Sequence, residues 1–226
     1  QRQMCIRDRN RQAIINPEAL HEPLEGFPKI AVSCFSRLTF QRMLEMFPHE
    51  LIYETSMANM AIPIYKLVID DNELATFNAP VGASACVAIL EDIFALGADK
   101  LVLFGTCGVL DEDIKETSII IPSHALRDEG TSFHYVEASE EIAVNVGVLD
   151  HFRFYLNERQ ISHKEGKVWT TDGIYRETNG KLKARKAAGA ICVDMECSAV
   201  AALAKFRGVD ICHFFYACLL YTSDAA

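Results

Sequence analysis

The sequence predicts a single domain with a layered α/β fold, and three observations support this. Short apolar runs alternate along the chain with stretches of helical periodicity, as strands and helices do in such folds. Of the 226 residues, 50% are hydrophobic and 23% are charged, which is ordinary for one globular core. The chain contains no internal repeat, low-complexity tract or linker that would divide it.

In the first half of the chain, Ser36 can cap a helix over Thr39–Phe47, which ends before Pro48. An amphipathic pattern predicts a longer helix over Gly82–Leu96, which Gly97 ends. The apolar runs around these helices predict strands at Lys29–Cys34, Leu51–Met57, Ala61–Ile69, Leu74–Asn78 and Lys100–Phe104.

In the second half, apolar runs predict strands at Thr117–Ile121, Ser162–Thr170 and His213–Ala217. Pro122 is expected to end the first of these strands, because proline cannot donate to a strand ladder. Helical patterns cover Ala138–Gln160, Arg176–Ala188 and Ser198–Phe206. The apolar run Ala188–Val193 leads into the last of these helices.

The composition argues against several classes of partner. The formal net charge of −9 and the pI near 5.3 disfavour nucleic-acid and membrane-surface binding. No apolar run reaches the roughly 18 residues of a membrane helix, and no signal-peptide pattern is present. We therefore expect a cytoplasmic protein. The eight cysteines include no Cys-x-x-Cys pair, so we expect reduced thiols and no metal site.

The most informative segment is Val193-Asp194-Met195-Glu196, at the junction between an apolar run and a helix. A carboxylate there can accept two hydrogen bonds from vicinal hydroxyls such as those of a ribose, and such charge-assisted bonds are about twice as strong as neutral ones. The alternative is structural. Asp194 and Glu196 would also complement the positive end of the following helix, by about 0.3–1 kcal/mol each.

A second segment has the pattern of a strand that ends in a loop of small residues: Leu101–Phe104 runs into Gly105-Thr106-Cys107-Gly108. Glycines let the backbone approach a ligand, and successive N–H groups can form a nest for phosphate oxygens. The Thr106 hydroxyl would add a further donor. Tight turns also need glycine for steric reasons alone, so a purely structural role is the alternative.

These segments and three others follow one another in the order found in one known family. The chain resembles the nucleoside phosphorylases of the uridine phosphorylase and hexameric purine nucleoside phosphorylase type, over roughly Ile30 to Ala217. The matching segments are Gly82–Gly97, Gly105–Leu110, Arg127–Tyr135, Thr170–Thr178 and Val193–Val209. The resemblance implies a three-layer α/β/α sandwich around a mixed, partly barrel-like sheet, assembled as a homo-oligomer, either a hexamer or a dimer.

Both ends of the chain differ from this family. Gln1–Arg9 has no periodicity or cap, and Cys218–Ala226 breaks off just after an apolar run. Both ends look like translated sequencing-adapter sequence, so we expect the native domain to span residues 10–217. The purine branch of the family uses an aspartate just beyond its last strand to protonate the leaving base. That region would follow Ala217, so the catalytic residue stays unknown.

For phosphate, the resemblance implies Arg37, at a helix start after the first strand, together with Gly105 and Thr106. A solvated Arg37 in a surface ion pair is the alternative. Two further phosphate arginines of the family are missing, because Leu103 stands at one position and residues 50–66 contain no arginine. Weak phosphate binding, water as the nucleophile, or a differently built pocket remain open.

For the ribose, the resemblance implies that Glu196 holds the 2′- and 3′-hydroxyls and that Met195 packs against the sugar. His134 would be another sugar or subunit-interface group. The alternative for His134 is a structural role, which is the more frequent one for a histidine in such a loop.

For the base, the resemblance implies a loop that contains Thr171, Asp172, Ile174 and Arg176. Ile174 replaces the usual phenylalanine, so stacking on the base is lost while apolar contact is retained. Arg176 could bind a pyrimidine carbonyl, although the Gln-x-Arg pair that marks uracil specificity is absent. The alternative for Arg176 is a place in a charged first helical turn.

The resulting functional hypothesis is a pentosyltransferase, a nucleoside phosphorylase that acts on a ribonucleoside, with uridine as the first candidate. Inorganic phosphate would be the co-substrate, and no cofactor or metal would be needed. Two alternatives stay open: a nucleosidase that uses water on the same fold, and a non-catalytic nucleoside-binding or inactive form. A dinucleotide oxidoreductase is disfavoured, since no Gly-x-Gly-x-x-Gly follows a strand.

Overall fold

The computed structural model of the protein describes residues 12–115 and 118–220. Its strands are β1 (Ile30–Cys34), β2 (His49–Met57), β3 (Met60–Ile69), β4 (Asn72–Asn78), β5 (Lys100–Val109), β6 (Ile119–Asp128), β7 (Glu141–Ala143), β8 (His163–Thr171), β9 (Ala190–Asp194) and β10 (Asp210–Leu220). Its helices are α1 (Pro17–Leu20), α2 (Arg37–Met46), α3 (Ala83–Leu96), α4 (Ser132–Tyr135), α5 (Leu149–Glu158), α6 (Asn179–Ala187), α7 (Cys197–Arg207) and the 3-10 turn Ile174–Arg176.

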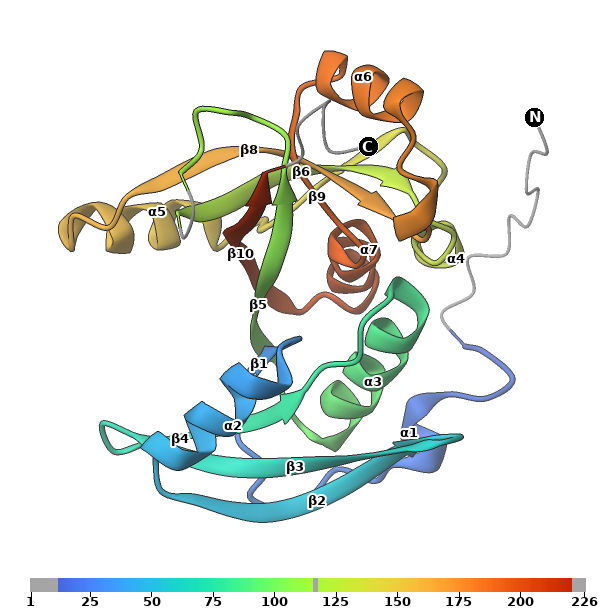
Figure 1. Ribbon diagram of the computed structural model, residues 1–226. Coiled ribbons are helices and arrows are strands. Elements are labelled where there is room, and N and C mark those ends of the chain that lie inside the picture. The colour runs from blue at the N-terminus through green and yellow to red at the C-terminus, as the bar shows by residue number, and fades with distance from the viewer. Residues whose placement is uncertain (1–11, 116–117, 221–226) are drawn as a thin grey trace.

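The long strand β5 belongs to two parts of the sheet at once (Figure 1). One edge of β5 pairs along its whole length with β10. The other edge pairs with β1 over residues 100–104 and with β9 over residues 108–109. From β1 an open sheet continues through β4 and β3 to β2. From β9 the pairing leads through β8 and β6 back to β10, so these strands and β5 close into a barrel.

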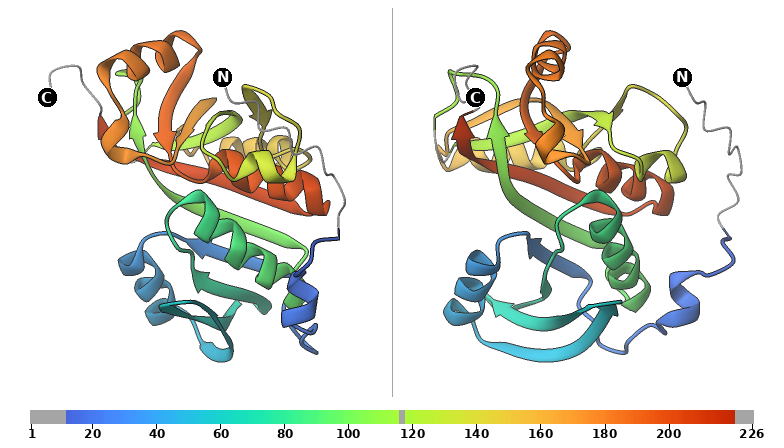
Figure 2. Two further views of the ribbon diagram at one scale, coloured as in Figure 1. Left: turned by 90° about the vertical axis from the view of Figure 1, so that its right-hand side faces the viewer. Right: turned by 45° about the vertical axis from the view of Figure 1, so that its right-hand side comes forward.

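Helices cover both faces of the open sheet (Figure 2). On one face α3 packs against α7, and both helices join Phe77 and Leu103 of the sheet in one buried core. On the other face lies α2, where the rings of Phe40 and Tyr65 are 6.1 Å apart between centroids. Parallel and antiparallel strand pairs occur side by side. The predicted α/β fold with a mixed central sheet is therefore confirmed.

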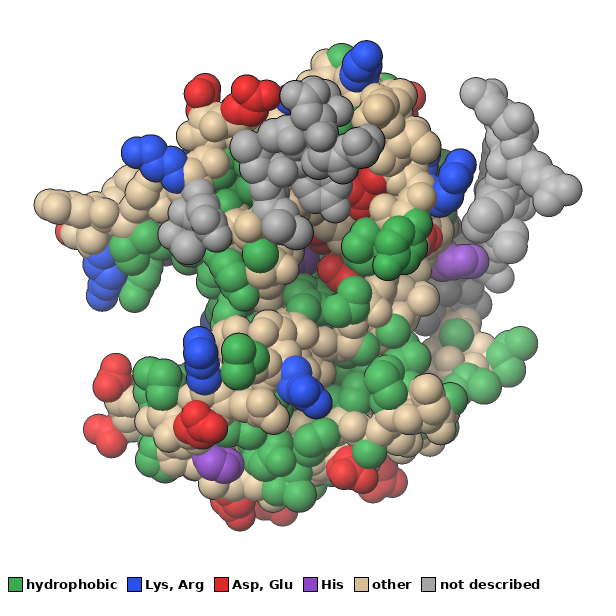
Figure 3. Space-filling model, in the orientation of Figure 1, with side chains coloured by type: hydrophobic (Ala, Val, Ile, Leu, Met, Phe, Trp, Pro, Cys, Tyr) green, Lys and Arg blue, Asp and Glu red, His purple; other side chains and the backbone are tan. Residues whose placement is uncertain are grey.

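The surface in the view of Figure 3 carries acidic and basic side chains in scattered positions. The basic side chains of the described residues do not gather into one patch on this face. None of the described helices is both long and apolar enough to cross a membrane.

The elements of the first half lie close to where the sequence predicts them. Ser36 caps α2 as expected, since its hydroxyl accepts the N–H of Thr39 at 3.2 Å. Gly97 ends α3 with a φ of +131°, a value that favours glycine. The predicted end of a strand at Phe104 is wrong. The strand β5 continues to Val109 because it stays paired with β10 beyond the first glycine.

Two predictions for the second half are also wrong. Pro122 does not end β6, because the register of the β6–β8 pairing shifts next to Pro122 and so accommodates a residue without an N–H group. Ala138–Gln160 is not mostly one helix. Glu141–Ala143 form β7 against β6, and positive φ angles at Asn145 and Gly147 break a helical path before α5.

The helix predicted over Arg176–Ala188 begins later than expected. The Thr178 hydroxyl accepts the N–H of Lys181 at 3.4 Å and caps α6, while the preceding residues form a 3-10 turn. The short helices α1 and α4 have no counterpart among the predicted elements.

The expected domain boundary at Ala217 falls inside β10, which runs to Leu220. The expected tail of residues 1–9 lies outside the described residues, as do residues 221–226 of the other tail. The first residue of the strand predicted over Thr117–Ile121 is also outside them.

A glycine substitution tests the close packing of β8 on β9 in the barrel. A Cβ atom at Gly166 would lie 2.5 Å from Cδ1 of Ile191, so we expect Gly166→Ala to lower the free energy of unfolding by about 1–3 kcal/mol. At Gly180 in α6 a Cβ meets nothing within 4 Å, and Gly180→Ala should leave stability unchanged or raise it by up to about 1 kcal/mol. Urea unfolding of the two variants measures both effects, and equal stabilities would contradict the packing.

Candidate functional site

The candidate site lies where the carboxyl ends of parallel strands from the two parts of the sheet come together. In the open sheet, β1 and β4 end at the register partners Cys34 and Asn78. In the barrel, β8 and β9 run parallel and end next to each other. One hydrogen bond joins the two groups, because Oε1 of Glu196, after β9, accepts the N–H of Gly82, after β4, at 2.5 Å. Ligands commonly bind outside the carboxyl ends of such strands.

Asp194 forms the turn that starts α7. Its Oδ2 accepts the N–H groups of Glu196 at 2.9 Å and of Cys197 at 2.6 Å. Its Oδ1 accepts the hydroxyl of Thr170 at 2.7 Å. These bonds occupy both oxygens of Asp194. Asp194 therefore has the structural role that was the alternative to ligand binding: it caps α7 and fixes the position of Glu196.

Glu196 has the more unusual environment. Its side chain is buried, and it accepts a hydrogen bond from a distant part of the chain, the N–H of Gly82. Burial, together with the charge of Asp194, raises the pKa of Glu196 to about 8. Burial also raises the pKa of Asp194 to about 6. At neutral pH Glu196 therefore carries its proton, whereas hydroxyls that donate to it would favour its ionised form.

A third buried carboxylate, that of Glu129, helps to hold the start of α7 in place, and sequence reasoning missed it. Its Oε1 accepts the hydroxyl of Ser198 at 2.7 Å and its Oε2 accepts the N–H of Ser132 at 2.9 Å. The Ser132 hydroxyl in turn accepts Nε of Arg127 at 2.8 Å. These bonds tie the loop before α4 to the first turn of α7. Glu129 and Arg127 lie in a segment that matches the family, but nothing in one sequence shows that they are buried.

Arg37 is exposed at the first turn of α2, as expected, directly after the end of β1. Gly105 and Thr106 lie within β5, so their predicted place in a loop is wrong. The steric alternative explains Gly105, because a Cβ atom there would lie 2.7 Å from Cδ2 of Phe35. The same contact shows that the turn that carries Arg37 lies against this part of β5.

One edge of β5 changes partners at these residues. The pairing with β1 ends at Phe104 and the pairing with β9 starts at Gly108. Among the described residues, no strand pairs with this edge over residues 105–107. The Thr106 side chain is exposed here. The sheet thus opens on the side where β1 ends and α2 begins.

The predicted ribose residues lie on two elements. Met195 is half-buried between Asp194 and Glu196, at the start of α7. His134 is exposed in the one-turn helix α4 rather than in a loop. The two elements are tied together by the bonds of Glu129 to both of them.

The predicted base residues are only partly available to a ligand. The carboxylate of Asp172 accepts the N–H of Gly130 at 2.9 Å, and its charge contributes to the raised pKa of Glu196. Ile174 and Arg176 are exposed in the 3-10 turn that follows. Thr171 is buried and its hydroxyl accepts the N–H of Gly173 at 3.3 Å, so it shapes the turn from inside.

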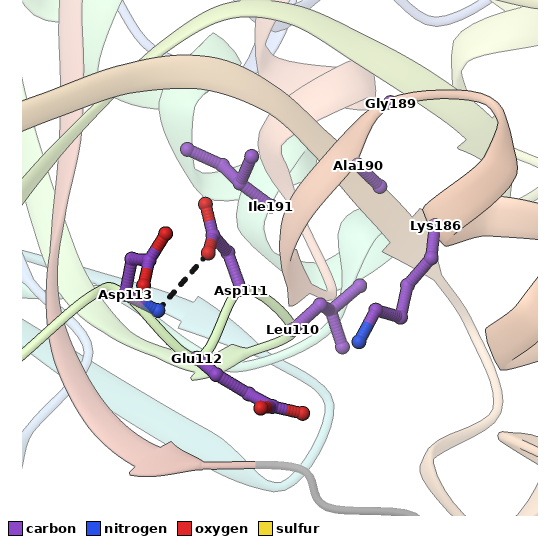
Figure 4. Close-up of a pocket in the computed structure, with 8 residues that line it drawn as sticks. All are labelled: Leu110, Asp111, Glu112, Asp113, Lys186, Gly189, Ala190 and Ile191. Atoms are coloured by element: carbon purple, nitrogen blue, oxygen red, sulfur yellow. Dashed lines mark hydrogen bonds between the residues drawn. The ribbon is translucent and has the colours of Figure 1, made fainter.

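A surface cavity of about 440 Å³ lies elsewhere, between the end of β5 and the α6–β9 turn (Figure 4). One of its acidic side chains is already engaged, because Asp111 accepts the N–H of Asp113 at 3.1 Å and pairs with Lys164 at 3.3 Å. It contains none of the predicted site residues. Among the described residues, no group of His, Cys, Asp and Glu side chains could hold a metal ion.

The raised pKa of Glu196 gives a testable pH dependence of stability. Between its usual pKa of 4.5 and about 8 the folded state holds more protons than the unfolded state. The free energy of unfolding should therefore fall as pH rises through this window. Glu196→Gln keeps an acceptor for Gly82 without ionising and should flatten much of the decline, whereas the exposed control Glu158→Gln should not. Urea unfolding at several pH values measures this, and a decline of the same slope in Glu196→Gln would contradict the assignment.

Comparison with solved structures shows the same fold in known proteins. A uridine phosphorylase from Vibrio fischeri superposes with a TM-score of 0.79 at 19% identity, covering 93% of this chain and 87% of that chain. A futalosine hydrolase mutant from Helicobacter pylori superposes with a TM-score of 0.70 at 20% identity, covering 84% of this chain and 89% of that chain. At these identities the likeness establishes the fold alone.

Curated relatives match parts of the chain. A guanosine phosphorylase from Halorubrum lacusprofundi is 22% identical over 148 residues, 64% of this chain and 61% of that protein. A DeoD-type purine nucleoside phosphorylase from Brevibacillus brevis is 30% identical over 111 residues, 48% of this chain and 46% of that protein. The matched part thus spans about half to three fifths of the length of these relatives.

A family described as the phosphorylase superfamily matches residues 29–226. This match covers most of the chain, including every strand of the barrel and the β9–α7 junction that carries Glu196. With the fold in agreement, the protein belongs to the phosphorylase superfamily.

Proposed function

We propose that this protein is a nucleoside phosphorylase that cleaves the N-glycosidic bond of a ribonucleoside with phosphate, to give free base and ribose 1-phosphate. Uridine is the first candidate substrate. The observation that carries the proposal is the buried carboxyl group of Glu196 at the β9–α7 junction, positioned by Asp194 and by Gly82. The superfamily agrees with it, as do the guanosine, purine nucleoside and uridine phosphorylases to which the chain is similar.

In the proposed reaction, phosphate attacks C1′ of the sugar while the bond to the base breaks through an oxocarbenium-like state. Glu196 would accept hydrogen bonds from the 2′- and 3′-hydroxyls, and Met195 would pack against the sugar beside it. Two hydroxyl donors would lower the pKa of Glu196, so that it releases its proton to solvent, and the resulting negative charge near the sugar would stabilise positive charge that develops at C1′. His134 would contact the sugar from α4.

The phosphate would bind between Arg37 and the open edge of β5 at Gly105 and Thr106. Arg37 supplies a positive charge at the start of a helix, where an anion is favoured. The exposed Thr106 hydroxyl supplies a donor. The backbone N–H groups that bind phosphate would come from the unpaired edge of β5, not from the loop that the sequence predicts.

The base would lie near Asp172, Ile174 and Arg176, which are exposed in the segment after β8. Thr171 would act indirectly, by holding this turn. No cofactor is required by this reaction. The proposal extends to a homo-oligomer, a hexamer or dimer, in the cytoplasm, and sedimentation analysis measures the assembly.

A hydrolytic nucleosidase is the second candidate, favoured by one specific observation. Leu103, at a position where the family resemblance implies a phosphate-binding arginine, is fully buried in the core beneath α3. That position therefore supplies no charge to an anion. One of the solved structures with a similar fold is that of a hydrolase, the futalosine hydrolase from Helicobacter pylori.

An assay of base release separates the two candidates. The protein is incubated with uridine and with inosine, with and without inorganic phosphate, and free base and ribose 1-phosphate are measured. The proposal predicts release that depends on phosphate, with equal amounts of base and ribose 1-phosphate. Equal release without phosphate would establish a nucleosidase, and no release in either buffer would favour a non-catalytic form.

A pair of ligands tests the role of Glu196. Wild-type protein should bind uridine more tightly than 2′-deoxyuridine, which lacks one of the two hydroxyls. Glu196→Ala should weaken uridine binding by about 10- to 100-fold, as expected for lost charge-assisted hydrogen bonds, and should bind the two ligands nearly alike. The exposed control Glu158→Ala should behave as wild type. Calorimetric titration measures these constants, and a preserved preference for uridine in Glu196→Ala would refute the role.

A further inference from the structure

Glu129, between β6 and α4, is a buried carboxylate that bonds to two separate elements. Its Oε2 accepts the N–H of Ser132 at 2.9 Å, at the start of α4, the helix that carries His134. Its Oε1 accepts the hydroxyl of Ser198 at 2.7 Å, in the first turn of α7 and 69 residues away along the chain. A carboxylate that only closed its own loop would need the first of these bonds and not the second.

The bond to Ser198 belongs to a continuous series of hydrogen bonds that ends at Glu196. The Ser198 N–H donates to Oγ1 of Thr170 at 3.1 Å, and the Thr170 hydroxyl donates to Oδ1 of Asp194 at 2.7 Å. Oδ2 of Asp194 accepts the N–H of Glu196 at 2.9 Å. All of these side chains are buried. The first turn of α7 is therefore held by Asp194 at the end of β9 and by Glu129 at the end of β6.

The position of this turn decides where the Glu196 carboxyl group lies. Ser198 follows Glu196 by two residues, so a shift of the first turn would move the carboxyl group relative to Gly82 and to a bound sugar. A displacement of about 1 Å in a reacting site can cost about 100-fold in rate. A buried polar network whose members are all bonded holds one arrangement and resists such a shift.

We propose that Glu129 is a positioning residue of the nucleoside site, which acts through Ser198 to place the Glu196 carboxyl group for the 2′- and 3′-hydroxyls of a ribose. The inference rests on the proposed function. Through Ser132 the same carboxylate fixes α4 relative to α7, so His134 and Glu196 approach the sugar as one unit. In this role Glu129 does not contact the sugar itself.

Two substitutions separate the hydrogen bonds of Glu129 from its charge. Ser198→Ala removes the bond to α7 and keeps the charge. Glu129→Gln removes the charge and can keep both bonds, because its amide oxygen can accept the N–H of Ser132 and its amide nitrogen can donate to the Ser198 hydroxyl. The matched control is Thr55→Val, which removes another hydroxyl-to-carboxylate bond of 2.7 Å, from the buried Thr55 to Asp92 in the second half of α3.

The first measurement needs no nucleoside. The Gly82 N–H donates to Oε1 of Glu196 at 2.5 Å, so the NMR resonance of its proton reports the position of that carboxyl group. Ser198→Ala should move this resonance upfield as the bond lengthens, whereas Glu129→Gln and Thr55→Val should leave it nearly unchanged. An unchanged Gly82 resonance in Ser198→Ala would overturn the proposal.

The second measurement is the ratio of the dissociation constants of 2′-deoxyuridine and uridine, by calorimetric titration at a temperature where every variant is folded. The ratio should fall about tenfold in Ser198→Ala, as expected for the loss of one charge-assisted hydrogen bond to the diol. It should stay near the wild-type value in Glu129→Gln and Thr55→Val. A wild-type ratio in Ser198→Ala, or an equal fall in either of the other variants, would overturn the positioning role. If wild-type protein itself does not distinguish the two ligands, the proposed function fails, and the Gly82 resonance decides the role of Glu129.

Discussion

The arrangement of this protein depends on the shared strand β5. One edge of β5 pairs with β10 throughout, and the other edge pairs with β1 over residues 100–104 and with β9 over residues 108–109. The open sheet and the barrel therefore end against each other, and the segments after β1, β4 and β9 meet at one place. Gly105 lets the turn after β1 approach β5 closely, since the Phe35 ring occupies the space that a side chain at position 105 would need. A site between two parts of one sheet follows from this connection.

Three buried carboxyl groups surround the start of α7, and they have different tasks. Asp194 and Glu129 are held by several hydrogen bonds each and fix the backbone. Glu196 accepts fewer hydrogen bonds, and burial beside Asp194 raises its pKa further than burial raises that of Asp194. A carboxyl group that is costly to ionise in the free protein can gain most from a ligand that donates hydrogen bonds to it. This separates the group proposed to bind a ribose from the groups that support it.

Much of the fold could be predicted from the sequence, because caps and periodicity are local signals, as at Ser36 and Gly97. The errors come from pairing between distant segments: β5 passes through its glycines and β6 passes Pro122 because their partners continue beside them. For the site, the sequence predicted that the chemistry takes place at the β9–α7 junction, and this stays a prediction. It did not predict the buried network of Glu129, because burial of a charged residue depends on tertiary packing.

The most direct test of this account is the titration of the Glu196 carboxyl carbon by ¹³C NMR, in the free protein and with saturating uridine. We expect an apparent pKa near 8 in the free protein and a clear decrease when uridine binds, since the sugar hydroxyls favour the ionised form. A pKa near the usual 4.5 in the free protein, or a raised pKa that uridine leaves unchanged, would contradict it.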